Sequence, residues 1–270
     1  MGKDVSLIME WQDDKYWNSF KEKWFRRSGI DLNLYKPAQM HRRINNFMQR
    51  SGAGDYDKFL EMLNADKELY HSFFEHLTIN VTEFFRTPEK FDELEKTIMP
   101  NLLSKSPKLR IWSAGCSIGA EPYSLAMMLS DISPGIGHRI LATDLDVEML
   151  AKARAGGPYL PNEVKNLPPA RIKKYFNQVK DGYVVNDDMR SKVDFKQQNL
   201  LKDTFETGFD LILCRNVVIY FTDEAKDKLY RNFFNSLKHG GVLFVGGTEA
   251  IMNFRDMGYS QIRPFFYQRG

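Results

Sequence analysis

The chain has 270 residues, 43% of them hydrophobic and 27% charged, which is typical of a globular protein with one medium domain and one small domain. The 38 Lys and Arg residues nearly balance the 35 Asp and Glu residues, and a net charge of +3 argues against a strongly basic nucleic-acid-binding protein. Two cysteines cannot form a disulfide framework, and no apolar run reaches the ~18 residues of a membrane span or forms a signal-peptide core. We therefore expect a cytoplasmic protein without direct insertion into a membrane.

Residues 1–82 predict a small domain that consists only of helices. Large apolar side chains recur at helical spacing in a segment that ends near Gly29, and a second helix with one apolar side is expected after Pro37. Two further helices are predicted at 56–63 and 69–79. Hardly any strand pattern occurs in this part of the chain, so we expect a helical bundle.

From Thr87 onward, short apolar runs alternate with helical segments. The predicted strands are 109–113, 140–143, 209–214 and 242–245, and the predicted helices between them are 122–131, 147–155 and 223–238. Continuous apolar strands separated by helices indicate a doubly wound, mostly parallel α/β sheet. A final strand at 263–268 is expected to pair antiparallel with this sheet.

We divide the chain on these patterns into the helical domain 1–82, a linker at 83–92 and an α/β domain at 93–270. An irregular insert at 158–198 interrupts the α/β pattern. It is expected to contain two short strands, 183–185 and 193–197. Neither an internal repeat nor a low-complexity segment is found.

The segment from Ile111 to Pro122 is the most informative, because an apolar strand leads through Ala114 and Gly115 into a helix. Small side chains allow a ligand to approach the backbone, and a helix N-terminus offers free N–H groups, although a glycine needed only for packing is an equal alternative. The next strand ends at Asp144, where an acid can accept from the ribose hydroxyls of a nucleoside or can cap a helix. Together the two patterns favour an adenosine-containing cofactor at the carboxyl ends of the strands.

Four segments, in order and spacing, resemble the signature of the CheR family, the chemotaxis receptor methyltransferases. They are Thr78–Arg86, Trp112–Ser124, Gln198–Leu201 and Cys214–Phe221. The resemblance extends over nearly the whole chain and implies a class I, Rossmann-like methyltransferase domain after a helical domain. It implies transfer of a methyl group from S-adenosylmethionine to glutamate side chains of bacterial chemoreceptors, with S-adenosylhomocysteine as product and no metal. One departure is Ala120, where the family usually has a glutamate before the one that matches Glu121.

The resemblance also implies roles for individual residues. Arg86 and Tyr220 are expected at the reaction centre. Contacts to the cofactor are expected from Asn80, Thr82, Arg86, Ala114, Gly115, Glu121, Asp144, Asn199, Leu200, Arg215 and Asn216. Of these, Glu121 should accept from the amino group and Asp144 should hold the ribose, with the adenine near 199–200 and the methionyl part near 215–216. Each residue has a structural alternative, such as a surface ion pair for Arg86 or a turn for Asn199.

The chemistry of methyl esterification is compatible with these residue types. A glutamate carboxylate has a pKa near ~4.3 and is ionised at neutral pH, so no general base is needed. The helix after Pro37 has a basic side formed by Arg42, Arg43 and Arg50, and the region from Leu32 to Gly54 contains no acid. We expect this side to dock the acidic, helical cytoplasmic region of the receptors, with a merely solvated basic face as the alternative.

Two other functions remain open from the sequence. A nucleic-acid methyltransferase of the same fold would use the basic helix to bind phosphates, but residues 215–218 lack the Asn-Pro-Pro-aromatic loop of amino-group methyltransferases, so nucleic acid is not an expected partner. A non-catalytic module that binds the cofactor or receptors is the second, and the presence of Arg86 and Tyr220 argues against it. We expect a monomer, and the short loop at 177–183 argues against binding of a receptor tether peptide.

Overall fold

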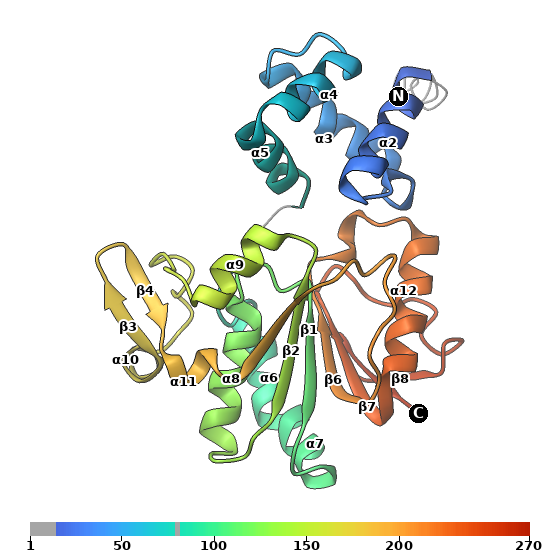
Figure 1. Cartoon of the computed structure of the whole chain (residues 1–270). Coiled ribbons are helices and arrows are strands. Elements are labelled where there is room, and N and C mark those ends of the chain that lie inside the picture. Colours follow the sequence, from blue (N-terminus) through green and yellow to red (C-terminus); the bar gives the residue numbers. More distant parts are fainter. Residues whose placement is uncertain (1–14, 79–81) are drawn as a thin grey trace. The chain divides into compact units, whose positions relative to one another are not determined.

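The computed structural model describes residues 15–78 and 82–270 (Figure 1). The described residues form two compact units. The first unit comprises 15–78 together with 220–227, and the second comprises the remaining described residues. No helix within these described ranges combines the length and the apolar character that crossing a membrane requires.

Four α-helices lie within residues 15–78 of the first unit, and all four were expected from the sequence. They are α2 (Lys15–Ser28), α3 (Pro37–Arg50), α4 (Tyr56–Ala65) and α5 (Lys67–Thr78), with the 3-10 turn η1 (Leu32–Leu34) between the first two. The core is aromatic, because Phe20, Trp24, Phe59 and Phe73 are at most 1% exposed. Phe59 and Phe73 meet edge to face with 4.9 Å between ring centroids, a favoured geometry for aromatic pairs.

A seven-stranded sheet forms the centre of the second unit, with the strand order β5-β2-β1-β6-β7-β9-β8. Its strands are β1 (Arg110–Ala114), β2 (Arg139–Asp144), β5 (Val193–Gln197), β6 (Phe209–Cys214), β7 (Leu237–Val245), β8 (Tyr259–Arg263) and β9 (Phe266–Arg269). The first five strands in this order are parallel, and β9 pairs antiparallel with both β7 and β8. The predicted α/β class with an antiparallel last strand is therefore confirmed.

Helices cover both faces of this sheet. Before β1 the chain forms α6 (Pro88–Glu93), the π-helical turn η2 (Leu94–Ile98) and α7 (Met99–Lys105). The connecting helices are α8 (Ala120–Ile132), α9 (Val147–Ala155) and α12 (Asp223–Ser236). In Figure 1, α8 and α9 lie on one side of the sheet and α12 lies on the other. Every residue of β6 is buried, which explains why all of its residues except Asp210 are apolar.

The prediction for the insert was half wrong. The strand expected at 183–185 is β4 (Gly182–Val185), but its partner is β3 (Phe176–Val179), and the two form a separate hairpin. The strand expected at 193–197 is not part of the insert. It is β5, which pairs parallel with β2 from Ile140↔Val193 to Asp144↔Gln197. As the outer strand of the large sheet, β5 has exposed polar positions, and its sequence therefore does not resemble that of the buried strands.

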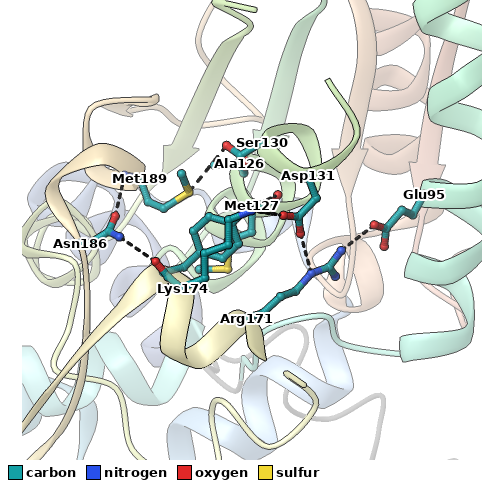
Figure 2. Close-up of polar contacts among 10 residues, drawn as sticks. Glu95, Ala126, Met127, Ser130, Asp131, Arg171, Lys174, Asn186 and Met189 are labelled. Carbon is teal, nitrogen blue, oxygen red and sulfur yellow. Dashed lines mark hydrogen bonds and ion pairs between the residues drawn. The ribbon is translucent and has the colours of Figure 1, made fainter. Parts of the chain in front are cut away.

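The helix α10 (Pro169–Tyr175) fixes the insert to the rest of this unit, while the short α11 (Asp187–Arg190) follows the hairpin. Figure 2 shows the Arg171 guanidinium pointing between the carboxylates of Asp131 and Glu95. Its Nε donates to Asp131 Oδ2 at 3.0 Å, and its Nη2 donates to Glu95 Oε1 at 2.5 Å. The Lys174 ammonium donates to Asp131 Oδ1 at 2.6 Å. Because Asp131 is on α8 and Glu95 is on η2, one arginine joins three elements.

Candidate cofactor site and active site

The loop that follows β1 is shaped by its neighbour strand. The Thr143 carbonyl oxygen, near the end of β2, accepts from the backbone N–H groups of Gly115 at 2.8 Å and Cys116 at 3.0 Å. Gly115 has a φ of +81°, and a Cβ added to it would lie 2.3 Å from Val217 Cγ2. Both the conformation and the contact require glycine. Gly115 and the buried Ala114 therefore allow the loop after β6 to approach the end of β1 closely.

The two acids at the end of β2 have different hydrogen-bond partners and different roles. Asp146 caps α9, because its Oδ1 accepts from the backbone N–H groups of Glu148 at 3.0 Å and Met149 at 3.2 Å. Asp144 instead accepts from Ser117 N at 2.6 Å and from Asp146 N at 3.0 Å. Burial raises the pKa of Asp144, and these two backbone donors oppose the rise. Asp146, and not Asp144, is thus the N-cap of α9.

Glu121 lies in a buried charge pair at the start of α8. Its Oε1 accepts from Ser113 Oγ at 2.8 Å, and its Oε2 is 3.4 Å from Arg215 Nη1. The exposed fraction is 14% for the Glu121 side chain and 3% for that of Arg215. Burial raises the pKa of Glu121, while the Arg215 charge and the Ser113 hydroxyl oppose the rise. The structure therefore brings together two of the residues that the family resemblance implied.

Arg215 also binds the segment that precedes α6. Its Nη2 donates to the Arg86 carbonyl oxygen at 2.8 Å and to Thr87 Oγ1 at 3.2 Å. Its guanidinium carbon lies 4.6 Å from the Phe244 ring centroid and 5.2 Å from that of Phe91. The buried Arg215 Nε has no hydrogen-bond partner among the described residues. Arg215 thus connects the end of β6 to the part of the predicted linker that contains Arg86.

The rest of that linker is held in an uncommon backbone conformation. Phe85 has a φ of +48° and Thr87 a φ of +64°, values that residues other than glycine adopt rarely. The Phe85 backbone N–H donates to Ser124 Oγ on α8 at 3.0 Å. The predicted cofactor residue Thr82 is half-buried at the start of this segment. Asn80 lies outside the described residues.

The predicted adenine contacts lie in a turn directly after β5. Asn199 Oδ1 accepts from Leu201 N at 3.0 Å, and Asn199 N donates to Asp203 Oδ2 at 2.8 Å, as in an Asx-turn. Leu200 is 9% exposed. The Gln198 backbone N–H donates to the Asp144 carbonyl oxygen at 2.9 Å, which places this turn beside the end of β2.

Tyr220 lies in the first unit, against the start of α3. The Lys36 backbone N–H donates to the Tyr220 carbonyl oxygen at 2.7 Å, and Tyr35 and Phe221 form an antiparallel bridge. Beside them is a cavity of about 330 Å³. Its lining residues are Lys36, Gln39, Met40, Arg42, Arg43, Asn46, His76 and Tyr220.

The three arginines expected to bind substrate differ in their surroundings. Arg42 is exposed, whereas Arg43 is half-buried and its Nε donates to the His76 carbonyl oxygen. Burial lowers the pKa of Arg43, and the nearby Arg50 lowers it further, against an opposing contribution from Tyr220. Arg50 does not line the cavity, and its Nε donates to the backbone of its own helix at 3.2 Å. Two of the three predicted residues thus meet at the cavity with Tyr220.

Two buried residues near these loops were missed by the sequence analysis. The Tyr159 hydroxyl, in the insert, donates to the Ile118 carbonyl oxygen at 2.7 Å and so holds the loop after β1. Glu249 is 4% exposed and accepts from backbone N–H groups of two loops. A signal for Glu249 existed, because it closely follows an apolar strand and two glycines, much as Asp144 ends an apolar strand. No group of three or more His, Cys, Asp or Glu residues suited to a metal occurs in the part of the chain that the structure describes.

A mostly parallel sheet with a small-residue loop after β1 and an acid at the end of β2 defines a Rossmann-like protein that binds a nucleoside cofactor. Comparison with protein families identifies the particular type. The family described as "CheR methyltransferase, SAM binding domain" matches residues 80–263, and "CheR methyltransferase, all-alpha domain" matches residues 16–78. The chain belongs to the CheR methyltransferase family.

Individual relatives agree with this assignment. A chemotaxis protein methyltransferase of Listeria innocua is 43% identical over 244 residues, which cover 90% of this chain and 92% of the relative. That of Listeria monocytogenes is 44% identical over the same shares. That of Escherichia coli is 34% identical over 247 residues, or 87% of this chain and 84% of the relative. The predicted family, methyltransferase activity and S-adenosylmethionine cofactor are therefore confirmed.

Proposed function

We propose that this methyltransferase esterifies glutamate side chains in the cytoplasmic helical region of bacterial chemoreceptors. The observation that carries the choice of substrate is the cavity in the first unit. Lys36, Arg42 and Arg43 line it together with Tyr220, and no acidic residue is among its described lining residues. Such a surface attracts an acidic helix and orients a carboxylate by charge complementarity. The enzyme would act from the cytoplasm, as a monomer recruited to membrane-bound receptors.

The residues at the strand ends fit S-adenosylmethionine. Each oxygen of a carboxylate has more than one acceptor site, so Asp144 can accept from ribose hydroxyls in addition to its two backbone donors. We assign Glu121 to the amino group of the cofactor and the turn at 199–200 to its adenine. Thr82, Ala114, Gly115 and Asn216 would complete the site through the loops on which they lie.

Arg215 is reassigned within this site. The sequence suggested direct contact with the methionyl part, but its guanidinium is nearly inaccessible and already binds Glu121 and the Arg86 backbone. We propose that it acts mainly by fixing these two residues in place. Arg86 would then balance the negative charge of the substrate carboxylate near the methyl group that is transferred.

The reaction requires the protein to orient the substrate carboxylate and the methyl group, and it does not require a proton transfer. When bound, S-adenosylmethionine supplies a methyl group activated by a sulfonium. The substrate carboxylate has a pKa near ~4.3 and is already ionised, so no residue has to remove a proton. Holding two reactants in the correct geometry can lower a barrier by up to ~7–11 kcal/mol. The Tyr220 hydroxyl is the proposed donor that orients the carboxylate.

Methyl transfer to different acceptors tests the proposal. Purified protein is incubated with labelled S-adenosylmethionine and either receptor-containing membranes or nucleic acid, and the products are treated with alkali. We expect label only in the receptors and its release as methanol, because a glutamyl methyl ester is base-labile. Arg86→Ala and Tyr220→Phe should fold normally and transfer methyl much more slowly. Label in nucleic acid, base-stable label, or cofactor binding without any transfer would contradict the proposal.

A further inference from the structure

A buried carboxylate joins the two loops that follow β6 and β7. Glu249 is 4% exposed and lies in the loop after β7. Its Oε2 accepts from Asn216 N at 2.6 Å and from Gly246 N at 2.9 Å, and its Oε1 accepts from Val218 N at 2.9 Å. Three backbone N–H groups thus converge on one side chain. Asn216 and Val218 are 33 and 31 residues away from Glu249 in the sequence, and Gly246 precedes it by three residues.

The surroundings leave little freedom for this carboxylate. A Cβ added to Gly246 would lie 2.2 Å from Glu249 Oε2 and 3.1 Å from Asn216 N, so a larger residue at that position would displace the carboxylate. The Tyr230 hydroxyl, on α12, donates to the Glu249 carbonyl oxygen at 3.1 Å. Side chain and backbone of Glu249 are therefore both fixed.

The loop that Glu249 holds has a conformation that needs support. Asn216 has a φ of +61°, in the left-handed region that residues other than glycine rarely adopt. The preceding residue, Arg215, binds Glu121 and the Arg86 carbonyl oxygen through its guanidinium. Val218 begins the 3-10 turn η3 (Val218–Tyr220). Two of the three donors to Glu249, Asn216 N and Val218 N, therefore lie in the segment between the predicted site residues Arg215 and Tyr220.

We infer that Glu249 is a positioning residue of the cofactor site. Its carboxylate holds the backbone at 216–218, and the conformation of this backbone determines how the Arg215 side chain is oriented at the end of β6. Arg215 then holds Glu121 and the Arg86 segment where the cofactor's methionyl part would bind. The role requires two acceptor oxygens, because the N–H groups approach both of them.

Glu249→Gln tests this role with almost no change in volume. A glutamine keeps one acceptor oxygen but turns an NH2 group towards backbone N–H donors, so part of the loop must move away. We expect the Kd for S-adenosylhomocysteine, measured by calorimetry on fully folded protein, to rise by at least about tenfold. In steady state, the KM for S-adenosylmethionine should rise similarly while the KM for receptor stays near the wild-type value.

Asp210→Asn is the matched control. Asp210 is a carboxylate only 5% exposed that accepts from Arg110 N and from Lys238 Nζ, but it lies at the opposite end of the parallel strands. This variant should lower the unfolding temperature without changing the Kd. If Glu249→Gln behaved like it, with a lower unfolding temperature and a wild-type Kd, Glu249 would be merely structural and the inference would be wrong.

A milder variant covers the case in which Glu249→Gln does not fold. Tyr230→Phe removes only the hydroxyl that holds the Glu249 backbone. The inference then requires a two- to fivefold weaker Kd for S-adenosylhomocysteine, about 0.4–1 kcal/mol, in a protein that remains folded. A wild-type Kd in this variant would overturn it.

Discussion

Replacing Arg215 by methionine should reveal how strongly the cofactor site depends on its buried charge pair. The side chains of Arg215 and Glu121 are 3% and 14% exposed, so solvent screens the pair only weakly. Removing one partner of a buried pair leaves an uncompensated charge, and such changes typically cost about 3–5 kcal/mol. Methionine fills most of the space between the Phe91 and Phe244 rings, so lost packing contributes little. We expect Arg215→Met to lower the free energy of unfolding by about 3 kcal/mol.

A double-mutant cycle separates the pair from other effects. Adding Glu121→Gln to Arg215→Met removes the stranded carboxylate, so the double variant should be more stable than Arg215→Met alone. Urea unfolding monitored by fluorescence gives the four free energies. If the two changes were simply additive, the Arg215–Glu121 pair would not be an important interaction and this reasoning would fail.

The pH dependence gives an independent check with a definite sign. Burial already raises the pKa of Glu121, and Arg215 opposes that rise. Without Arg215 the pKa should rise further, so the folded state keeps a proton that the unfolded state loses near its ordinary pKa of 4.5. The free energy of unfolding of Arg215→Met should therefore fall as the pH rises above about 4.5, more steeply than that of wild type. Equal slopes for both proteins would contradict the assignment.

Three further experiments test other parts of the molecule. Gly115→Ala should lower the free energy of unfolding by about 2 kcal/mol or more, because Gly115 has a φ of +81° and the new Cβ would lie 2.3 Å from Val217 Cγ2. Adding Val217→Ala should recover part of this loss, as measured by urea unfolding. Arg42→Glu should raise the KM for receptor severalfold at an unchanged Kd for S-adenosylhomocysteine, whereas Arg43→Glu should also lower the unfolding temperature, because Arg43 Nε donates to a backbone carbonyl. Tyr159→Phe should cost about 1 kcal/mol in the same unfolding assay, through the lost hydrogen bond to the loop after β1, and an undiminished stability would show that this bond is unimportant.

The parts of the fold that the sequence predicted are those where burial alone determines residue type. β6 is buried along its whole length, its residues are apolar except for Asp210, and it coincides with the strand predicted at 209–214. The hairpin strand β3 was not predicted, and the outer strand β5 was predicted at 193–197 but assigned to the insert. Both have several exposed positions, so neither shows the continuous apolar run of a buried strand. Their place in a sheet depends on backbone pairing with β2 and β4, which side-chain patterns do not encode.

For the site, local patterns were informative and long-range contacts were not. Asp144 follows directly from its place at the end of a strand, and its partner Ser117 is in the neighbouring loop. Glu249 and Tyr159 contact loops that are 33 and 41 residues away. The place of Glu249 after an apolar strand marks it as a candidate residue, but no motif in either segment indicates which loop the side chain contacts. The distinction between a residue that touches the cofactor and one that positions others, as for Arg215, also requires knowledge of burial.

The central claim is that S-adenosylmethionine binds at the carboxyl ends of β1 and β2, with Asp144 holding its ribose. Calorimetric titration of the purified protein, and of Asp144→Ala, with S-adenosylmethionine and S-adenosylhomocysteine tests it most directly. We predict one binding site per chain and at least about tenfold weaker binding, or about 1.4 kcal/mol, in the variant. A folded wild-type protein that binds neither compound, or a folded Asp144→Ala variant with unchanged affinity, would contradict the claim.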